Sequence, residues 1–272
     1  MIDFEKIIKS SQQYNFHTHT QYCDGRDNIE SFVKSAISQD FHWLGFSPHS
    51  PVLCESGCNM KKELVSQYTN EVETMKSKYG CQINIFTGME IDFFDNWGPS
   101  NEYFKCLPLD YRIGSIHFIP SFNEENEYVD VDGCSVDFKK KMSLYFDNDI
   151  KQVVTSFYNQ TLKMIDAGGF DIIGHFDKIS NNANSFMPGI EEEAWYKKLV
   201  REVFDAIIDN KYIIEINTKA YGDFNRFFPN KNYFKWIKDY NAPFVVNSDA
   251  HFCDKLNSGR NEAFQLLNEI LI

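Results

Sequence analysis

Residues 168–177 are Gly168-Gly169-Phe170-Asp171-Ile172-Ile173-Gly174-His175-Phe176-Asp177. This segment contains the end of one structural unit and the core of the next. Its two glycines stop an amphipathic helical pattern over residues 149–167, as glycine does at helix C-termini. A short apolar run at 172–175 follows and predicts a strand buried on both faces. Polar residues, His175 and Asp177, come where this strand ends. A helix, a buried strand and a polar strand end together predict one α/β unit.

The same unit recurs along the chain on both sides of this segment. Short apolar runs, mostly rich in Ile, Val or aromatic residues, predict strands at residues 14–17, 43–47, 83–89, 111–117, 172–175, 212–216 and 244–247. Amphipathic patterns predict helices between and after them at residues 28–39, 61–79, 149–167, 191–209, 231–240 and 257–271. Residues 119–148 lack a clear period, so we expect a long loop with short elements that covers a site.

Strands that alternate with helices predict a parallel α/β fold. A closed or distorted (β/α)7 barrel and an open doubly wound sheet both fit this alternation. Polar residues at every strand end favour the barrel, because its strands all direct their C-terminal ends to one face. A length of 272 residues without a repeat or a low-complexity linker predicts a single domain over residues 1–272.

Composition excludes several classes of protein. The net charge is −12 and no Lys/Arg-rich run is present, which argues against binding of long nucleic acid. No apolar run approaches the ~20 residues of a membrane span, and the first ten residues do not resemble a signal peptide. Seven cysteines without a Cys-x-x-Cys pair favour reduced thiols in the cytoplasm over disulfides or a cysteine-based zinc site. A homo-oligomer is compatible with this composition.

Metal-binding residue types follow nearly every predicted strand. Six of the seven histidines occupy such positions, and the exception is His42. His17 and His19 are two residues apart, so on a strand both side chains point to the same side. The full set of strand-end candidates is His17, His19, Asp24, His49, Glu90, Asp92, His117, His175, Asp177, Glu215, Asp249 and His251. Histidine and carboxylate ligands suit Zn, Mn or Fe, and we expect one shared metal site.

Three members of this set have a second interpretation. Asp92, Asp177 and Glu215 suit an outer role, in which a carboxylate orients a ligand or caps an element, at least as well as direct metal binding.

The ordered motifs resemble those of the polymerase-and-histidinol-phosphatase (PHP) family. They are His-Thr-His-Thr at 17–20 with Asp24, Ser-Pro-His at 47–49, Gly-Met-Glu at 88–90, Gly-Ser-Ile-His at 114–117, Gly-His-Phe-Asp at 174–177 and Ser-Asp-Ala-His at 248–251. Within the family, the chain is most similar to the stand-alone histidinol-phosphatases. The resemblance implies a distorted (β/α)7 barrel with three divalent transition-metal ions. The first ion would be bound by His17, His19, Glu90 and Asp249, the second by Glu90, His117 and His175, and the third by Asp24, His49 and His251.

The resemblance also implies an activity, the hydrolysis of a phosphate monoester by a hydroxide that bridges the metal ions. The expected substrate is histidinol phosphate, in histidine biosynthesis. Asp249 and His251 are the candidates for moving a proton. Lys219, Arg226 and, more weakly, Arg260 are the candidates for binding the phosphate. Residues 219–226 depart from the subgroup, which commonly places an arginine sooner after the Glu-Ile-Asn-Thr motif.

Alternative functions remain open at this point. A PHP nuclease or phosphodiesterase could act on short oligonucleotides, since an acidic chain excludes only long nucleic acid. A metal-binding PHP module without turnover is a second alternative, although the stand-alone chain keeps a ligand at every motif position. Hydrolysis of protein phosphotyrosine is a third, because the same metal centre supports it.

Overall fold

Seven parallel strands form the centre of the computed structural model, which describes residues 2–125 and 127–271. Their order across the sheet is β1-β2-β3-β4-β7-β8-β9. These strands are β1 (Tyr14–Asn15), β2 (Trp43–Phe46), β3 (Asn84–Asp92), β4 (Tyr111–Ser115), β7 (Ile172–Ile173), β8 (Ile213–Asn217) and β9 (Phe244–Asn247). Each of these strands begins within two residues of the first residue of a strand predicted from the apolar runs. All seven strand predictions are therefore confirmed.

The first and last strands meet and almost close the sheet. Thr18, just after β1, forms a parallel bridge with Ala250, just after β9, and the His19 amide donates a hydrogen bond to the Ala250 carbonyl over 2.9 Å. An open doubly wound sheet would leave these two strands at opposite edges. The predicted distorted (β/α)7 barrel is therefore confirmed, and the open-sheet alternative is excluded.

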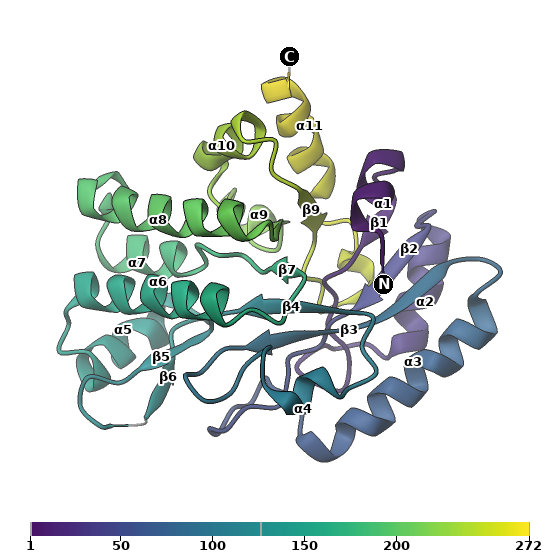
Figure 1. The fold of residues 1–272 in the computed structure, drawn as a ribbon, viewed down its shortest axis with the longest axis horizontal. Helices are drawn as coiled ribbons and strands as arrows, with labels where there is room; N and C mark the ends of the chain where they lie inside the picture. Colours follow the sequence, from purple (N-terminus) through teal and green to yellow (C-terminus); the bar gives the residue numbers. More distant parts are fainter. Residues whose placement is uncertain (1, 126, 272) are drawn as a thin grey trace.

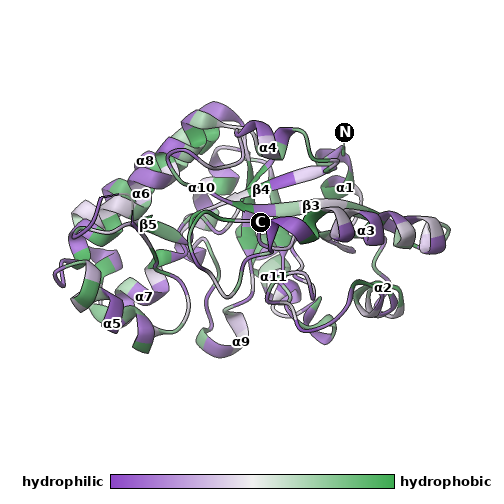
Figure 2. Ribbon diagram, turned by 90° about the horizontal axis from the view of Figure 1, so that it is seen from below, coloured by the Kyte–Doolittle hydropathy of each residue, from purple (hydrophilic) through white to green (hydrophobic). Residues whose placement is uncertain are grey.

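Helices surround the strands on the outside (Figure 1). α6 and α8 lie on one side of the strands, and α2 and α3 lie on the other (Figure 2). The α-helices are α1 (Phe4–Ser10), α2 (Ile29–Ser38), α3 (Val65–Tyr79), α4 (Glu102–Lys105), α5 (Ser135–Tyr145), α6 (Ile150–Ala167), α7 (Ile179–Phe186), α8 (Ala194–Asn210), α9 (Tyr221–Phe224), α10 (Phe234–Asp239) and α11 (Arg260–Leu271). Within the described ranges, no helix is long and apolar enough to cross a bilayer.

Helix starts follow the capping residues in the sequence. The Asn28 side chain accepts a hydrogen bond from the Ser31 amide at the start of α2, and Asp149 does the same for the Gln152 amide at α6. Short 3₁₀ turns precede α3, α8 and α10 at Lys62–Leu64, Ile190–Glu192 and Lys231–Tyr233. These turns lie at the start of three helices predicted from the sequence, those over residues 61–79, 191–209 and 231–240.

Aromatic side chains fill the barrel interior at the end opposite the polar strand ends. Tyr111 and Phe16 are fully buried there, with ring centroids 5.9 Å apart. Gly45 and Gly88 make room for Tyr111, because a Cβ on either glycine would come within 2.3 Å of its side chain. Helix α1 covers this end, and its Phe4 ring packs edge-on against Phe16 at 5.0 Å.

The prediction for residues 119–148 needs a correction. This region contains a hairpin, β5 (Phe118–Pro120) with β6 (Tyr128–Asp130), and the 11-residue helix α5. Only Phe138 and Met142 of α5 are buried, so the sequence shows no apolar stripe long enough to predict a helix. The predictions also missed the helices α1, α4, α7 and α9, each of eight residues or fewer.

Candidate metal centre

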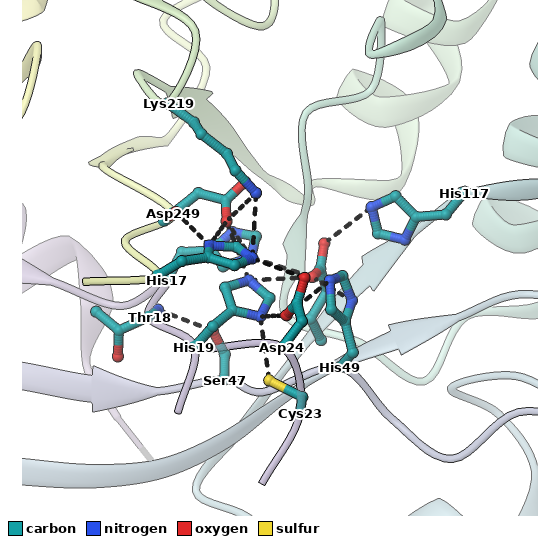
Figure 3. A network of polar contacts seen from close by, with 12 residues as sticks. His17, Thr18, His19, Cys23, Asp24, Ser47, His49, His117, Lys219 and Asp249 are labelled. Atoms are coloured by element: carbon teal, nitrogen blue, oxygen red, sulfur yellow. Dashed lines mark hydrogen bonds and ion pairs between the residues drawn. The ribbon is translucent and has the colours of Figure 1, made fainter. Parts of the chain in front are cut away.

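Six histidines that are far apart in the sequence lie together at one end of the barrel. Figure 3 labels four of them, His17, His19, His49 and His117. Each of the six follows the C-terminal end of a strand, as the parallel topology requires. They are His17 and His19 after β1, His49 after β2, His117 after β4, His175 after β7 and His251 after β9. The structure also brings Asp24, Glu90 and Asp249 into this group, so all nine predicted ligand positions share one site.

The Glu90 carboxylate lies at the middle of the cluster. Its Oε1 is 2.9 Å from His175 Nε2 and 3.5 Å from His117 Nε2. Its Oε2 is 3.2 Å from His17 Nε2 and 3.0 Å from His49 Nδ1. Each oxygen thus faces a different set of imidazoles, which is the geometry of a carboxylate that bridges two cation positions.

Asp249 and Asp24 provide carboxylates on either side of His19. Asp249 Oδ1 lies 3.0 Å from His19 Nε2 and 3.9 Å from His17 Nε2. Asp24 Oδ1 lies 3.9 Å from His49 Nε2, and its Oδ2 lies 3.2 Å from His251 Nε2. The donor atoms form overlapping groups, each within 4.8 Å: His19, Asp24, His49 and His251; His17, His19 and Glu90; and Glu90, His117 and His175.

Several donor atoms in this cluster are buried and have no hydrogen-bond partner among the residues that the structure describes. They are His17 Nε2, His19 Nε2, His49 Nδ1, Asp24 Oδ1 and Glu90 Oε2. Leaving such atoms without a partner in the interior costs free energy, and buried polar atoms in proteins are almost always satisfied. Divalent cations among these atoms would satisfy all five, so the donor set fits transition-metal ions.

Two further carboxylates lie behind the histidines. Glu215 Oε1 is 2.6 Å from His17 Nδ1, and Glu215 also accepts hydrogen bonds from Asn247 Nδ2 and the His175 amide. Asp92 Oδ1 is 2.7 Å from His117 Nδ1. Both carboxylates contact the ring nitrogen that faces away from Glu90, so they orient the imidazoles, as outer carboxylates do at metal sites.

Asp177 is placed differently. Its Oδ2 accepts a hydrogen bond from the Asn230 amide over 2.8 Å, and burial raises the pKa of its carboxyl group to about 7. Asp92 and Glu215 each contact a histidine of the cluster. Among the described residues, the Asp177 side chain forms no hydrogen bond or ion pair with any of the six histidines.

Because the charged groups lie close together, the pKa values of several residues in the cluster are shifted. Burial opposes ionisation of Glu90, but His17 and His49 outweigh it and hold the pKa of Glu90 well below its usual range. Burial also opposes protonation of His117, but Asp92 and Glu90 outweigh it and raise the pKa of His117 to about 10. His19 has a lowered pKa because of burial and the nearby His251 and His49. Cation binding would displace ring protons, so it should release protons to solvent.

Asp249 also has an unusual backbone conformation. Its φ of 50° lies in the left-handed region, which few residues other than glycine adopt. Such conformations often occur at active sites, where the surrounding structure enforces them. Here the turn after β9 places the Asp249 carboxylate beside His19.

The sequence from the first to the fifth motif falls in one known family. Residues 15–219, three quarters of the chain, match the model of the PHP domain. The chain belongs to the PHP domain family. The resemblance noted from the motifs is thereby confirmed.

Relatives of this PHP domain include a histidinol-phosphatase from Bacillus subtilis, which is 23% identical over 269 residues, covering 88% of this chain and 94% of the relative. The hisK protein of Listeria monocytogenes has the same fold, with a TM-score of 0.81, 18% identity and coverage of 92% of this chain and 99% of that one. The histidinol phosphate phosphatase of Lactococcus lactis, solved with zinc, L-histidinol and phosphate, has a TM-score of 0.72, 17% identity and coverage of 95% and 94%.

A cavity of about 330 Å³ opens beside the PHP metal centre. Asp24, His49 and His117 form its floor on the metal side, and two lysines, Lys178 and Lys219, also line it. The remaining lining residues include the aromatic side chains Phe118, Phe224 and Phe228 and the acidic side chains Asp130, Asp132 and Asp223.

The two lysines have different surroundings. Lys219 Nζ lies 3.3 Å from Asp249 Oδ1 and 3.3 Å from His251 Nε2, and its side chain is 39% exposed (Figure 3). Lys178 is only 11% exposed and lies 3.5 Å from Asp132 Oδ2. The sequence reasoning missed Lys178, although it directly follows the Gly-His-Phe-Asp motif, three residues after His175, and so had a positional signal.

The two arginines proposed from the sequence do not line this cavity. Arg226 binds Glu191 through both terminal nitrogens, at 2.9 and 2.6 Å, and donates to Ser180 Oγ. Arg260 is 1% exposed, and its guanidinium donates to the carbonyls of Gln12, Tyr14 and Val246. Both guanidinium groups are thus engaged within the protein, and neither lines the cavity where a phosphate would bind. His42 lies at the N-terminal end of β2, away from the histidine cluster.

Proposed function

We propose that this PHP domain is a metal-dependent phosphate monoester hydrolase, and that its substrate is L-histidinol phosphate. The observation that carries the proposal is the cluster of nine ligand-capable side chains around Glu90, beside a cavity with basic and acidic walls. The similarity to histidinol-phosphatases supports the choice of substrate.

Three cation positions are proposed from the overlapping donor groups. Glu90 would belong to two of them, one through each carboxylate oxygen. The proposed ligand sets are His17, His19, Glu90 and Asp249; Glu90, His117 and His175; and Asp24, His49 and His251. Zn, Mn and Fe all suit these ligands. When bound, such cations neutralise phosphoryl oxygens and lower the pKa of water towards ~7.

The protein's own cations are proposed to bind the phosphate. Lys178 and Lys219 line the cavity beside the cluster, and each ammonium group has three protons to donate. Asp249 orients Lys219 through the 3.3 Å contact. Asp249 and His251 are proposed to hold or move a proton near the leaving oxygen, since they contact both the cluster and Lys219.

The acidic and aromatic side chains of the cavity suit the alcohol that leaves. The alcohol part of histidinol phosphate has a cationic amino group and an imidazole. Asp130 and Asp132 would attract the cationic groups, while Phe118 and Phe228 provide apolar surface for the ring and exclude water. The cavity lining thus offers basic groups for the phosphate and acidic groups for the cationic part of the same substrate.

A substrate panel tests this proposal. Protein stripped with a chelator is reloaded with Zn, Mn or Fe and assayed on histidinol phosphate, a phosphotyrosine peptide and a short oligonucleotide. We expect phosphate release chiefly from histidinol phosphate, with three equivalents of metal by elemental analysis. Cleavage of the oligonucleotide alone would assign the chain to the nuclease alternative. No turnover of any substrate would favour the non-catalytic module.

The variant Asp249→Ala separates catalysis from folding. We expect it to lose nearly all phosphatase activity while its circular dichroism spectrum and elution volume match those of the wild type. Unchanged activity would refute the role given to Asp249. The elution volume also reports whether the chain is a monomer or a homo-oligomer. A cytoplasmic location is proposed from the seven cysteines, which are all unpaired.

A further inference from the structure

Four of the six proposed ligand histidines contact a partner through the ring nitrogen turned away from the metal position, and the partners differ in kind. His17 Nδ1 contacts the Glu215 carboxylate at 2.6 Å, and His117 Nδ1 contacts the Asp92 carboxylate at 2.7 Å. His251 Nδ1 lies 3.0 Å from the carbonyl oxygen of its neighbour Asp249. His19 is the exception, because its Nδ1 lies 3.5 Å from the sulfur of Cys23 (Figure 3).

The turn after β1 is built to bring Cys23 to this position. The Cys23 amide donates to the Thr20 carbonyl over 3.0 Å, which folds the chain back beneath His19. Gly25 allows the tight packing, since a Cβ there would come within 2.5 Å of the His19 carbonyl carbon. The next residue after Cys23, Asp24, reaches the cluster itself, so two consecutive side chains of the turn serve one histidine-rich site.

The proton positions follow from the geometry of the ring. His19 Nε2 is buried without a hydrogen-bond partner and faces Glu90 and Asp249, where a cation needs its lone pair. The proton must then be on Nδ1, which donates to Cys23 Sγ at 3.5 Å, because Asp24 Oδ1 lies farther away at 3.7 Å and is itself a proposed metal ligand. The thiol hydrogen in turn donates to the Thr20 carbonyl over 3.4 Å. The chain of donors runs from the ring through the thiol to the backbone.

We propose that Cys23 is a positioning residue of the metal centre, which fixes the orientation and the tautomer of His19 by accepting the Nδ1–H hydrogen bond. This inference rests on the metal sites of the proposed function but not on the choice of substrate. Outer partners of metal-binding histidines commonly change metal affinity by about 10- to 100-fold when removed. A thiol is a weak acceptor, so the effect of Cys23 should fall near the lower end of that range.

Three substitutions at this position separate hydrogen bonding from packing. Cys23→Ser keeps an acceptor, Cys23→Val fills the space without one, and Cys23→Ala removes both. Cys81→Ala is the matched control, because Cys81 is an exposed cysteine that precedes β3 at the opposite end of the barrel. Zinc affinity is measured by competition with a chromophoric chelator, and thermal unfolding of the metal-free proteins checks the fold.

We expect zinc affinity at the weakened site to fall about tenfold in Cys23→Val and Cys23→Ala, and less in Cys23→Ser. In the zinc-loaded wild type and in Cys23→Ser, the His19 Nδ1 proton should give a slowly exchanging NMR signal that the valine variant lacks. Wild-type affinity and an unchanged ring-proton signal in Cys23→Val would overturn the inference. That outcome leaves the proposed phosphatase activity standing, because the wild-type substrate panel tests it separately.

Discussion

Lys178 illustrates how the fold brings a charged residue that follows a metal motif in the sequence into the cavity. It follows His175 closely, and the short helix α7 starts just after it. Burial would lower the pKa of Lys178, but Asp132 and Asp249 outweigh it and keep the ammonium group protonated. The side chain therefore brings a fixed positive charge to the cavity beside the metal centre.

Replacing Lys178 with Met tests its proposed contact with the phosphate. A hydrogen bond to a charged group contributes about 1.5–3 kcal/mol, so we expect kcat/KM for histidinol phosphate to fall roughly 10- to 100-fold. Lys178→Arg should recover part of the loss. Lys163→Met, at an exposed position on α6, is the control. If Lys178→Met has wild-type kinetics with bound metal unchanged, the phosphate is held elsewhere.

At the scale of single residues, the sequence predicted the metal-ligand candidates better than the residues that form hydrogen bonds with them. His17 and Glu90 could be placed in one site because parallel strands end at one face. The contact between His17 and Glu215 depends on the register of β1 and β8, which become near neighbours, with β9 between them, only when the barrel closes. The burial of Arg260 beneath the barrel could not be predicted either, because nothing local distinguishes a buried guanidinium from an exposed one.

Helix α1 provides the first test at the scale of elements. Phe4 is buried against Phe16 and Tyr111 at the end of the barrel remote from the metals. Removing a buried phenylalanine ring costs about 3–5 kcal/mol, and the terminal position favours the lower value. Urea denaturation of Phe4→Ala should show a loss of about 3 kcal/mol with metal content unchanged. Glu5→Ala on the exposed face should have little effect, and equal stability of the two variants would contradict the packing role of α1.

The contact between α2 and α3 predicts a dependence on pH. Tyr79 and Lys78 donate to Glu30 at 2.6 and 2.9 Å, and with Lys34 they lower the pKa of Glu30 to about 2. A carboxyl group with a depressed pKa stabilises the fold above its unfolded value of about 4.3, and this contribution is lost as the pH falls towards 2. The urea midpoint of Glu30→Gln should therefore lie below that of the wild type at pH 6.

The difference between the two midpoints should narrow as the pH is lowered from 4.5 towards 2. A carboxyl resonance of Glu30 that titrates near pH 4.3 by NMR would show that the three donors do not act on it. Lys151→Met, at an exposed lysine on α6, leaves Glu30 untouched and should keep the wild-type pH profile.

Helices with a strong hydrophobic period could be predicted from the sequence, and helices without such a period could not. Helix α6 buries nine residues along one face, so its pattern is unmistakable. Helix α5 buries two, and it is held in place by contacts with other parts of the chain such as the Phe138 packing in the larger core. Its existence depends on tertiary structure that no short window of sequence contains.

At the scale of the whole molecule, we propose that residues 1–272 fold as one domain whose stability depends on metal. Stripping the cations leaves the acidic groups Glu90, Asp24 and Asp249 and several imidazoles close together and only partly compensated. Ligand at 1,000 times its dissociation constant adds about 4.1 kcal/mol to the free energy of unfolding. Calorimetry should show one transition that moves to lower temperature with a chelator and returns with zinc.

The outcome of that measurement separates two ideas. Two transitions in the loaded protein would contradict a single domain, and an unchanged midpoint after stripping would contradict a structural contribution of the metals. Magnesium at the same concentration is a suitable control, since nitrogen-rich sites bind it poorly.

The chain between β4 and β7 forms an excursion from the barrel. This excursion affects how the substrate preference of such an enzyme can evolve. Eight of the nine proposed ligands lie outside this excursion and the ninth, His117, lies near its start, whereas Phe118, Asp130 and Asp132 of the cavity lining come from residues 118–132. Beyond His117, chemistry and selectivity are therefore encoded in separate stretches of chain. Grafting the excursion of a relative onto this barrel should alter which alcohol departs while leaving the hydrolytic machinery intact, so new preferences could evolve without rebuilding the centre that breaks the bond.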